Sequence, residues 1–575
     1  LAPSDGDCIW REHGCDGCNA IGVPHPECCL LVTRPQGMNC FHGQNSTNIH
    51  FHGMHISPQK PQDWVLLQLH PPKRDDPGAP CDGVNCYGQF QYRVDPVRDH
   101  QSEGTHWYHP HKHGSTAAQL GNGMAGAIIV EGPFDDWLNR QFKRKLRERT
   151  LVIQQIHDLN FTSTATISGE IPLINGLLMP SVTMYPGEIQ RWRVVSATME
   201  ASAQIAIDFN SVANTPVRVK QIAMDGVRFS DRNYQCQPLL NPGPQWTCTG
   251  FPPDPKFYLS PGNRADFLVR APDREGTYMI SYDVFGAVER QGLDTKQPPG
   301  GHERDLTRTR QMTREALDSI APGDLQPALL SIKVIACPPR DRCERMEFPP
   351  KLRPMPEFLE TIVPTDPGHK LQFQIVRQPQ GPPTLTLPPP PGPNALFGVW
   401  LKGPNRVMQF QEDCAAVTLP LNPRGGQKWE ISQNVNTIVR RSGVPGAPLH
   451  VFHMHTNPFQ VVSTVVRDQK ITYPEPIWMD SVTVPNNRND GHHDPERPSG
   501  QVEILQRFQD FTGQFVLHCH FLGHEDRGMM LSVQTVCPQR QDAYSVPSPD
   551  QQECVGEFLK ALPPCLTTTP ATQHH

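Results

Sequence analysis

Short apolar runs, each bounded by proline, glycine or charged residues, recur along the whole chain. Examples are GAIIVEGP (126–133), RWRVVSA (191–197), RADFLVRAP (264–272) and FQVVSTVV (459–466). Runs of this length that are rich in Val, Ile and Phe predict β-strands, and many such strands separated by turn residues are typical of β-sandwiches and barrels. Proline accounts for 62 of the 575 residues, about twice its average share, which argues against long helices. We therefore expect an all-β protein.

Two polar segments and one proline-rich segment interrupt the apolar runs. The first polar segment covers 130–150, the second runs from about Gln291 to Arg314, and the proline-rich segment covers 338–395. The chain length suggests about three to four domains, and these segments are candidate connectors between them. A short internal echo, YPGEIQRWRVVSA around Trp192 and NPRGGQKWEISQN around Trp429, is consistent with repeated domains.

The charge balance gives no indication of nucleic-acid binding. The 52 Lys and Arg residues against 58 Asp and Glu residues give a net charge of −6, and no basic cluster offsets it. Apolar runs such as Met124–Val130 are too short to cross a bilayer. The chain begins at Leu1 without a basic and apolar leader, so we expect any signal peptide to have been removed.

Cysteine usage points to an oxidising compartment. Six of the 17 cysteines precede residue 41, and eight others form close pairs: Cys81/Cys86, Cys236/Cys248, Cys337/Cys343 and Cys554/Cys565. Setting Cys519 aside leaves 17 − 1 = 16 cysteines, which can all be bridged, and sequons at Asn45 and Asn160 are available for N-glycosylation. We expect disulfide bonds and a secreted, extracellular or periplasmic location. The alternative is several free buried thiols.

Four His-x-His pairs are the strongest signal in the sequence: His50/His52, His109/His111, His453/His455 and His518/His520. In a β-strand, residues two apart share a face and neighbours point to opposite sides, so each pair directs both imidazoles to one side. Around Cys519 the same alternation sends His518 and His520 one way and the cysteine the other. His450 lies three residues before His453 and therefore points to the cysteine side. This spacing predicts two sites, back to back.

The first predicted site contains His450, Cys519, His524 and Met529. Two imidazoles, a thiolate and a weak thioether are the ligands of a one-electron copper centre. Zinc accepts two histidines and a cysteine but gains little from methionine. The second predicted site contains the eight paired histidines. Eight neutral imidazoles with no obvious carboxylates suffice for about three copper ions at two or three ligands each, and the backbone of Cys519 joins the two sites.

These motifs resemble those of the multicopper oxidases, the laccase-like family with three cupredoxin domains. The similarity is carried by TNIHFHGMHISP, GTHWYHPHKHGS, LHVFHMHTNPFQVV and DFTGQFVLHCHFLGHEDRGMM, with support from GMAGAIIVEGP, INGLLMPSVTMYPGEIQRWRVVSA and WMDSVTVP. It covers about residues 46 to 535. The resemblance implies three tandem cupredoxin-like Greek-key β-barrels or sandwiches: 1–135, with the cysteine-rich N-terminal segment and the first two histidine pairs, then 150–310 and 325–540, followed by a C-terminal tail at 541–575.

The resemblance also implies a role for each candidate residue. Type 1 copper is expected on His450, Cys519 and His524 with Met529 axial. The remaining three coppers are expected on the paired histidines: type 2 on His50 and His453, one type 3 on His52, His109 and His520, and the other type 3 on His111, His455 and His518. Glu525 lies where relatives carry a carboxylate that relays protons, although a solvated or salt-bridged acid is the alternative. Asp63 lies where relatives carry an acid near type 2 copper.

The implied activity is that of a laccase-type, copper-dependent oxidase. A reducing substrate gives electrons one at a time at His450 and His524, Cys519 carries them to the histidine cluster, and O2 becomes two waters. Phenols and aromatic amines are the first substrate class that we expect. A metallo-oxidase acting on cuprous or ferrous ions is the second, although the 16 methionines form no cluster. From other classes, the alternatives are a non-catalytic copper-binding cupredoxin protein and a zinc hydrolase with the His-x-His-x-x-His pattern of HFHGMH (50–55).

Overall fold

The structure is a computed structural model in which β-strands dominate, as the apolar runs predict. It describes residues 39, 42–43, 45–76, 78–94, 101–142, 146–155, 172–199, 205–209, 217–240, 248, 256–283, 328–338, 343–377, 395–402, 406–412, 414–422, 425–433, 450–466, 469–485 and 500–537. The helices within these ranges are short, and the longest is α3 (Pro133–Gln141). In these ranges, no helix has the length and hydrophobicity that spanning a bilayer requires.

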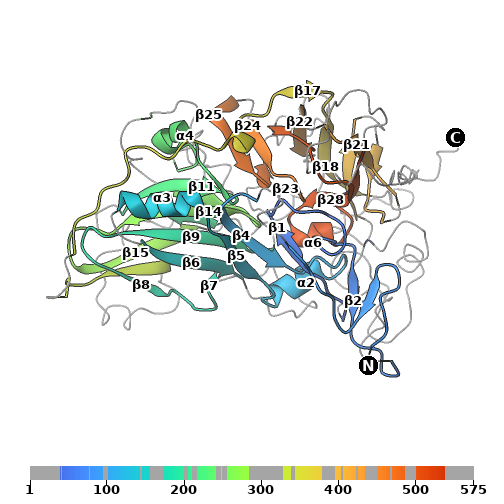
Figure 1. The fold of residues 1–575 in the computed structure, drawn as a ribbon, viewed down its shortest axis with the longest axis horizontal. Helices are drawn as coiled ribbons and strands as arrows, with labels where there is room; N and C mark the ends of the chain where they lie inside the picture. The colour runs from blue at the N-terminus through green and yellow to red at the C-terminus, as the bar shows by residue number, and fades with distance from the viewer. Residues whose placement is uncertain are drawn as a thin grey trace, which may run out of the picture.

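The first group of strands carries two of the histidine pairs. A three-stranded sheet has the order β1 (His50–His52), β4 (Gly104–His109) and β5 (Gly126–Val130). Beside it, β2 (Gln68–His70) and β3 (Asn85–Tyr87) form a parallel pair, and the disulfide Cys81–Cys86 closes the turn that leads into β3. In Figure 1 this group is blue; β1, β4 and β5 lie between the other two groups, and β2 extends to the lower right.

The second group forms two sheets in the middle of the chain, green in Figure 1. The six-stranded sheet has the order β12 (Val227–Arg228), β11 (Arg218–Met224), β14 (Arg264–Arg270), β9 (Ile189–Ala197), β6 (Arg147–Gln154) and β7 (Leu173–Ile174). The five-stranded sheet has the order β13 (Lys256–Leu259), β10 (Ile205–Asp208), β15 (Gly276–Asp283), β16 (Ala328–Val334) and β8 (Ser181–Met184). The runs RWRVVSA and RADFLVRAP lie in β9 and β14, which are buried along their whole length.

The third group carries the other two histidine pairs. Its larger sheet has the order β20 (Arg406–Met408), β19 (Ala395–Leu401), β18 (Lys370–Arg377), β22 (Gly426–Gln433), β27 (Gln501–Gln506), β24 (Phe459–Val466) and β25 (Gln469–Met479), and β17 (Pro364–Asp366) also pairs with β22. The smaller sheet has the order β21 (Val417–Pro420), β29 (Met530–Val536), β28 (Gly513–Cys519), β23 (His450–Met454) and β26 (Ser481–Val484).

The polar segment 130–150, which we interpret from sequence as a connector, contains α3. Phe134 and Leu138 of this helix are buried, and Asp135 receives hydrogen bonds from Arg191 and Arg193 of β9. Asp266 of β14 pairs with the same two arginines. These buried charges attach α3 to the six-stranded sheet, and Figure 1 shows the helix lying beside that sheet. Helix packing, and not a flexible link, therefore follows the first group of strands.

Strand β16 belongs to the second group of strands, although the expected domain boundaries would place it in the third. β16 pairs with β15 and with β8, so it completes a sheet of the second group, whereas the expected boundary at residue 325 assigns it to the third. Strand pairing here is set by partners about 50 and 150 residues earlier in the chain, which composition alone does not reveal. The boundaries 1–135, 150–310 and 325–540 otherwise stay predictions.

Three of the four close cysteine pairs form disulfides: Cys81–Cys86, Cys236–Cys248 and Cys337–Cys343. Within the part of the chain that the structure describes, Cys519 is the one free cysteine. The pair Cys554/Cys565, the sequon at Asn160, the N-terminal segment before residue 39 and the tail 541–575 lie outside the described residues.

Candidate metal centres

The register of β23 against β28 places the predicted ligands on two faces of one sheet. Phe452 is opposite Cys519, and His453 is opposite His518. Directly opposed residues share a face and strand neighbours do not. His450 therefore lies on the face of Cys519, while His453 and His518 lie on the other. The alternation predicted from the sequence is the one observed.

The first face holds a compact group of two histidines and one cysteine. Nδ1 of His450 lies 3.3 Å from Sγ of Cys519, and Nδ1 of His524 lies 3.8 Å from the same sulfur and 3.3 Å from Nδ1 of His450. His450 and Cys519 are buried, and His524 is partly buried. Met529 is also buried, and its backbone bonds to Cys519 and His524. All four residues that the sequence assigns to this site thus lie together.

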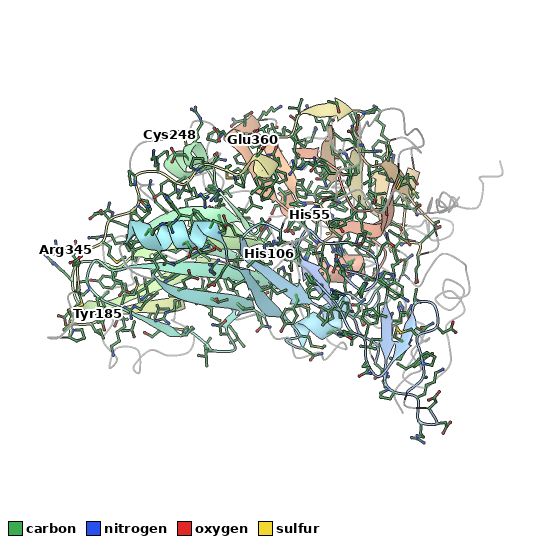
Figure 2. All side chains as sticks on the ribbon, viewed as in Figure 1. His55, His106, Tyr185, Cys248, Arg345 and Glu360 are labelled. Atoms are coloured by element: carbon green, nitrogen blue, oxygen red, sulfur yellow. A yellow bond between two sulfur atoms is a disulfide. The ribbon has the colours of Figure 1, made fainter. Side chains whose placement is uncertain are left out.

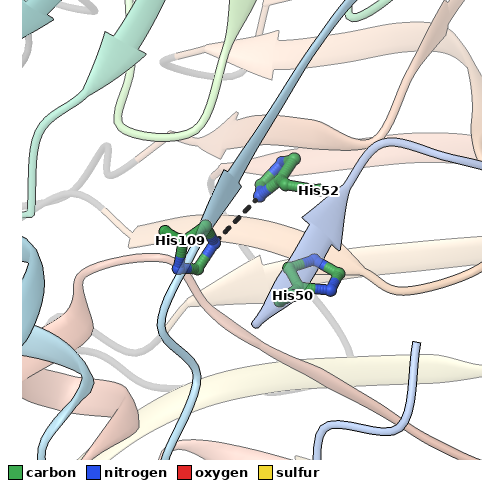
Figure 3. Close-up of side chains that lie close together, drawn as sticks. All are labelled: His50, His52 and His109. Atoms are coloured by element: carbon green, nitrogen blue, oxygen red, sulfur yellow. Dashed lines mark hydrogen bonds between the residues drawn. The ribbon is translucent and has the colours of Figure 1, made fainter. Parts of the chain in front are cut away.

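The second face meets β1 and β4 of the first group. His50 is opposite His109 in the β1–β4 pair, and His50, His52 and His109 lie close together (Figure 3). Nδ1 of His52 lies 3.4 Å from Nε2 of His109 and 3.3 Å from Nε2 of His520. Three ring nitrogens from three separate strands or turns therefore converge on one point.

Two further groups complete the cluster of eight histidines. Nε2 of His518 lies 3.2 Å from Nε2 of His111 and 3.2 Å from Nε2 of His455. Nε2 of His50 lies 3.4 Å from Nε2 of His453. The two groups and the trio around His52 together use all eight paired histidines, from the first and third groups of strands.

Burial keeps these imidazoles uncharged. It lowers the pKa of His111 to about 4 and that of His518 to about 3, and the pKa of His50, His52 and His453 well below the usual value. Two unprotonated ring nitrogens that face each other repel through their lone pairs, and a bound cation removes this repulsion. Neutral imidazole is the form that binds a metal. The donor set therefore fits copper, a metal that imidazole ligands suit.

The same burial raises the pKa of the Cys519 thiol to about 12. A thiol in this environment does not ionise near neutral pH, so a metal must displace its proton to bind. The pKa of His450 falls to about 3 for the same reason. Cys519, ionised once a metal displaces its proton, and two neutral imidazoles are the ligands that the sequence predicts for a one-electron copper centre.

Three buried carboxylates lie around the histidine cluster, each beside an outer ring nitrogen of one of its histidines. Asp63 accepts a hydrogen bond from Nδ1 of His50 at 2.8 Å. Asp480 accepts one from Nε2 of His52 at 3.0 Å. Oε2 of Glu525 lies 2.9 Å from Nδ1 of His518. Each acid faces the ring nitrogen opposite the one that points into the cluster, an arrangement that fixes the tautomer of a metal ligand.

Two of these acids were predicted from the sequence as functional residues, and both are buried. Burial raises the pKa of Asp63 to about 7, and the hydrogen bond from the backbone N–H of Phe51 opposes it. Burial likewise raises the pKa of Glu525 to about 7, against the charge of His111 and a hydrogen bond with Thr116. Neither is a solvated acid, because both have at most 2% of their surface exposed.

Sequence reasoning missed Asp480, Arg264 and Asp526. Asp526 accepts hydrogen bonds from the backbone N–H groups of Gly114 and Ala117 at 2.7 and 2.9 Å, and so joins the last motif to the start of α2 (Thr116–Gly121). The available signal for Asp480 was its place as a lone acid in the apolar phrase WMDSVTVP. A lone charge that is buried between two apolar strands requires a partner.

His55 and His106 lie near the cluster without joining it (Figure 2). Nδ1 of His55 donates to the backbone oxygen of Thr456 at 2.8 Å, and Nε2 lies 2.7 Å from Oδ2 of Asp510. His106 is buried beside Gly226 of the second group. With both of its ring nitrogens occupied, His55 cannot complete a His-x-His-x-x-His zinc site with His50 and His52.

Solved structures of multicopper oxidases share this fold over most of the chain. The enzyme from Pediococcus acidilactici is 18% identical, with 86% of this chain and 78% of that chain covered and a TM-score of 0.53. McoA from Aquifex aeolicus is 17% identical, with 86% and 85% covered and a TM-score of 0.51. A laccase-like CueO from Ochrobactrum sp., described as having oxidase activity towards lignin model compounds, is 16% identical, with 86% of each chain covered and a TM-score of 0.51. No curated protein sequence matches the chain.

Two sequence-family models match the parts of the chain that carry the histidine pairs. Each is described as multicopper oxidase, and they match residues 38–134 and 388–538. These segments contain all of the histidines and the cysteine of the two centres. The chain therefore belongs to the multicopper oxidase family, copper oxidoreductases that use oxygen.

Proposed function

We propose that this protein is a laccase-type oxidase that oxidises phenols or aromatic amines one electron at a time and reduces O2 to two waters. Four such oxidations, together with four protons, balance the reduction of one O2. One observation supports the proposal most directly. His518 and Cys519 are consecutive in β28, but their side chains face two different histidine groups.

Four copper ions are proposed, and each has its own residues. His450, Cys519 and His524, with Met529 as a further and weaker ligand, would hold the type 1 copper. The histidine cluster would hold the rest: type 2 on His50 and His453, one type 3 on His52, His109 and His520, and the other type 3 on His111, His455 and His518. Bound copper would supply the one-electron chemistry and the reduction of O2.

The residues around His524 are the proposed place where the substrate binds. His524 is partly exposed, and the ring of Phe397 lies 5.0 Å from it. The guanidinium of Arg527 stacks on Phe397 at 3.8 Å. Because Phe397 is buried and the guanidinium covers its ring, the partly exposed Arg527 is the group that faces a substrate here, and its charge suits an anionic phenolate. The same cation repels ferrous and cuprous ions, so among the described residues the surroundings of His524 favour the organic substrate.

Two buried acids are placed to handle protons at the histidine cluster. We propose that Glu525, which lies between His518 and the start of α2, delivers protons for the reduction of O2. Asp63 holds the proton on Nδ1 of His50, which leaves Nε2 to face His453. Both acids have raised pKa values because they are buried, so each can hold a proton near neutral pH.

A secreted, glycosylated form is also proposed. The three disulfides between close cysteine pairs support an oxidising compartment. Asn45 of the first sequon is exposed, as an acceptor of N-glycosylation requires. Treatment of the protein with an amidase that removes N-glycans, followed by mass measurement, tests this part of the proposal.

The substrate class is tested by comparing turnover of a methoxyphenol with turnover of ferrous and cuprous ions under identical conditions. We expect kcat/KM to be highest for the phenol. Arg527→Glu should lower kcat/KM for the phenol and raise it for the metal ions, because the charge beside His524 is reversed. A wild-type enzyme that oxidises only ferrous or cuprous ions would instead identify a metallo-oxidase of the same family.

A further inference from the structure

A buried ion pair connects the second group of strands to the histidine cluster. Arg264 of β14 donates from Nη1 to Oδ1 of Asp480 at 2.7 Å and from Nη2 to Oδ2 at 2.5 Å. Arg264 is fully buried and Asp480 is 1% exposed. Two parallel N–H···O bonds fix the plane of the carboxylate as well as its position.

The backbone around Asp480 is held from the same side. The carboxylate of Asp225, in the turn between β11 and β12, accepts hydrogen bonds from the backbone N–H groups of Asp480 and Ser481 at 3.2 and 3.3 Å. It also accepts one from the backbone N–H of Arg264 at 2.8 Å. The second group of strands therefore determines where the segment 480–481 lies.

Asp480 in turn determines how two histidines face the cluster. Its carboxylate accepts a hydrogen bond from Nε2 of His52 at 3.0 Å, which leaves Nδ1 to face His109 and His520. Its backbone oxygen accepts one from Nδ1 of His453 at 2.7 Å, which leaves Nε2 to face His50. A carboxylate or carbonyl on one ring nitrogen fixes both the tautomer and the ring orientation of a metal ligand.

The close approach of these groups depends on a glycine. Gly53 directly follows His52 and has φ +81. A Cβ at this position would lie 1.8 Å from Nη2 of Arg264 and 2.5 Å from Oδ2 of Asp480. Any other residue would displace the guanidinium or the carboxylate. The absence of a side chain at Gly53 therefore allows Arg264 and Asp480 to pack directly against the end of β1.

We propose that Arg264 and Asp480 are positioning residues through which the second group of strands, which supplies none of the proposed ligands, sets the copper affinity of the histidine cluster. This inference rests on the proposed function, in which that cluster binds copper. The carboxylate of this buried ion pair bonds to Nε2 of His52, a contact that a role in folding alone does not require.

The test measures copper retention separately at the two centres of the full chain. Wild type and Asp480→Asn are loaded with copper and titrated with a chelator, while total copper is measured by atomic absorption and the first centre is followed by its blue absorption. We expect the chelator concentration that removes half of the cluster copper to fall about 10–100-fold in the variant, with the blue absorption retained.

Asp266→Asn is the matched control. Asp266 is a buried carboxylate of the same strand as Arg264. It pairs with Arg191 and Arg193 and accepts a hydrogen bond from Thr105 of β4, and among the described residues it bonds to none of the eight paired histidines. Its loss should lower the melting temperature of the copper-free protein and leave copper retention unchanged. If Asp480→Asn lacks the blue absorption because it does not fold, Arg264→Lys, which keeps the charge but loses the paired hydrogen bonds, replaces it in the same titration.

The outcomes separate this inference from the proposed function. Wild type without copper beyond the blue centre would overturn both. Wild type with cluster copper, and a variant that retains this copper equally well, would overturn the inference alone. Loss of cluster copper from Asp266→Asn to the same extent as from Asp480→Asn would also overturn it, because general destabilisation would then explain the effect.

Discussion

His518 and Cys519 are consecutive in β28, yet their side chains belong to different centres. Nε2 of His518 lies 3.2 Å from Nε2 of His455, whereas Sγ of Cys519 lies 3.3 Å from Nδ1 of His450. Strand alternation produces this division, and the peptide bond between the two residues is the shortest connection between the centres. In the proposed function, an electron that enters at the first centre therefore has a path through covalent bonds to the second.

Replacing the sulfur should remove the first centre and leave the second. We expect Cys519→Ser to lose the blue absorption, to bind one copper fewer than wild type and to lose turnover of phenols, because serine offers no soft thiolate ligand. Copper analysis and absorption spectroscopy of the purified variant check this prediction. A variant that stays blue would show that Cys519 is not the ligand responsible for the colour.

Two adjacent methionines provide a matched pair for the axial position. Met529 and Met530 are both buried, with 0% and 1% of their surface exposed. We expect Met529→Leu to remain blue and to raise the reduction potential of the first centre, because a weak donor is replaced by a group that does not bind. Met530→Leu should leave the potential unchanged. Redox titration of both variants decides the matter, and equal shifts would count against an axial role for Met529.

Glu525→Gln should slow the reduction of O2 and leave electron entry intact. The amide cannot deliver a proton, so we expect turnover to fall about 10²-fold, the scale of general acid catalysis. Anaerobic bleaching of the blue colour by a phenol should keep its wild-type rate. The control is Glu503→Gln, which alters an acid of β27 that pairs with Lys428 and Lys470. Slower bleaching in Glu525→Gln would assign the residue to the first centre instead.

The pair of His55 and Asp510 should make stability depend on pH. Burial and the charge of Arg507 lower the pKa of His55. The charge and hydrogen bond of Asp510 raise it by more, so that the pKa lies above 6.5. Burial raises the pKa of Asp510. It is nevertheless below 3.8, because it is lowered by the charge and hydrogen bond of His55, by the N–H of Phe511 and by the charge of Arg507. The stabilisation is therefore complete between these two values. It is lost as pH rises through the raised pKa of His55 and as pH falls through the lowered pKa of Asp510.

Unfolding of wild type and Asp510→Asn across this range measures that contribution. We expect a difference in the free energy of unfolding of about 2 kcal/mol near pH 5, the usual value for a hydrogen bond to a charged group, which shrinks as the pH is raised or lowered beyond the window. A difference that is independent of pH would mean that the pair is not ionised in the folded protein.

The direction in which each histidine pair points could be predicted because it is local, whereas the resemblance to multicopper oxidases implied which histidines come together. Alternation along β28 and the odd spacing of His450 from His453 depend only on strand conformation, and the register of β23 against β28 agrees with them. The buried partners could not be predicted in this way. Asp480 and Arg264 are 216 residues apart, and only the packing of two separate groups of strands brings them together.

Two further differences have the same origin. Helix α3 lies in a polar segment. Its Phe134 and Leu138 are buried, and its Asp135 is paired, only because the sheet with Arg191 and Arg193 packs against it. The position of β16 depends on pairing with β15 and β8, which no composition change signals. Long-range packing, and not local propensity, decides each of these features.

The central claim is that the two centres form one enzyme that transfers four electrons to O2. The most direct measurement is the number of one-electron phenol oxidations per O2 consumed by the copper-loaded protein, with hydrogen peroxide assayed in the same vessel. We predict four oxidations per O2 and no peroxide. Two oxidations per O2 with one equivalent of peroxide would contradict the account, because the histidine cluster would then not complete the reduction to water.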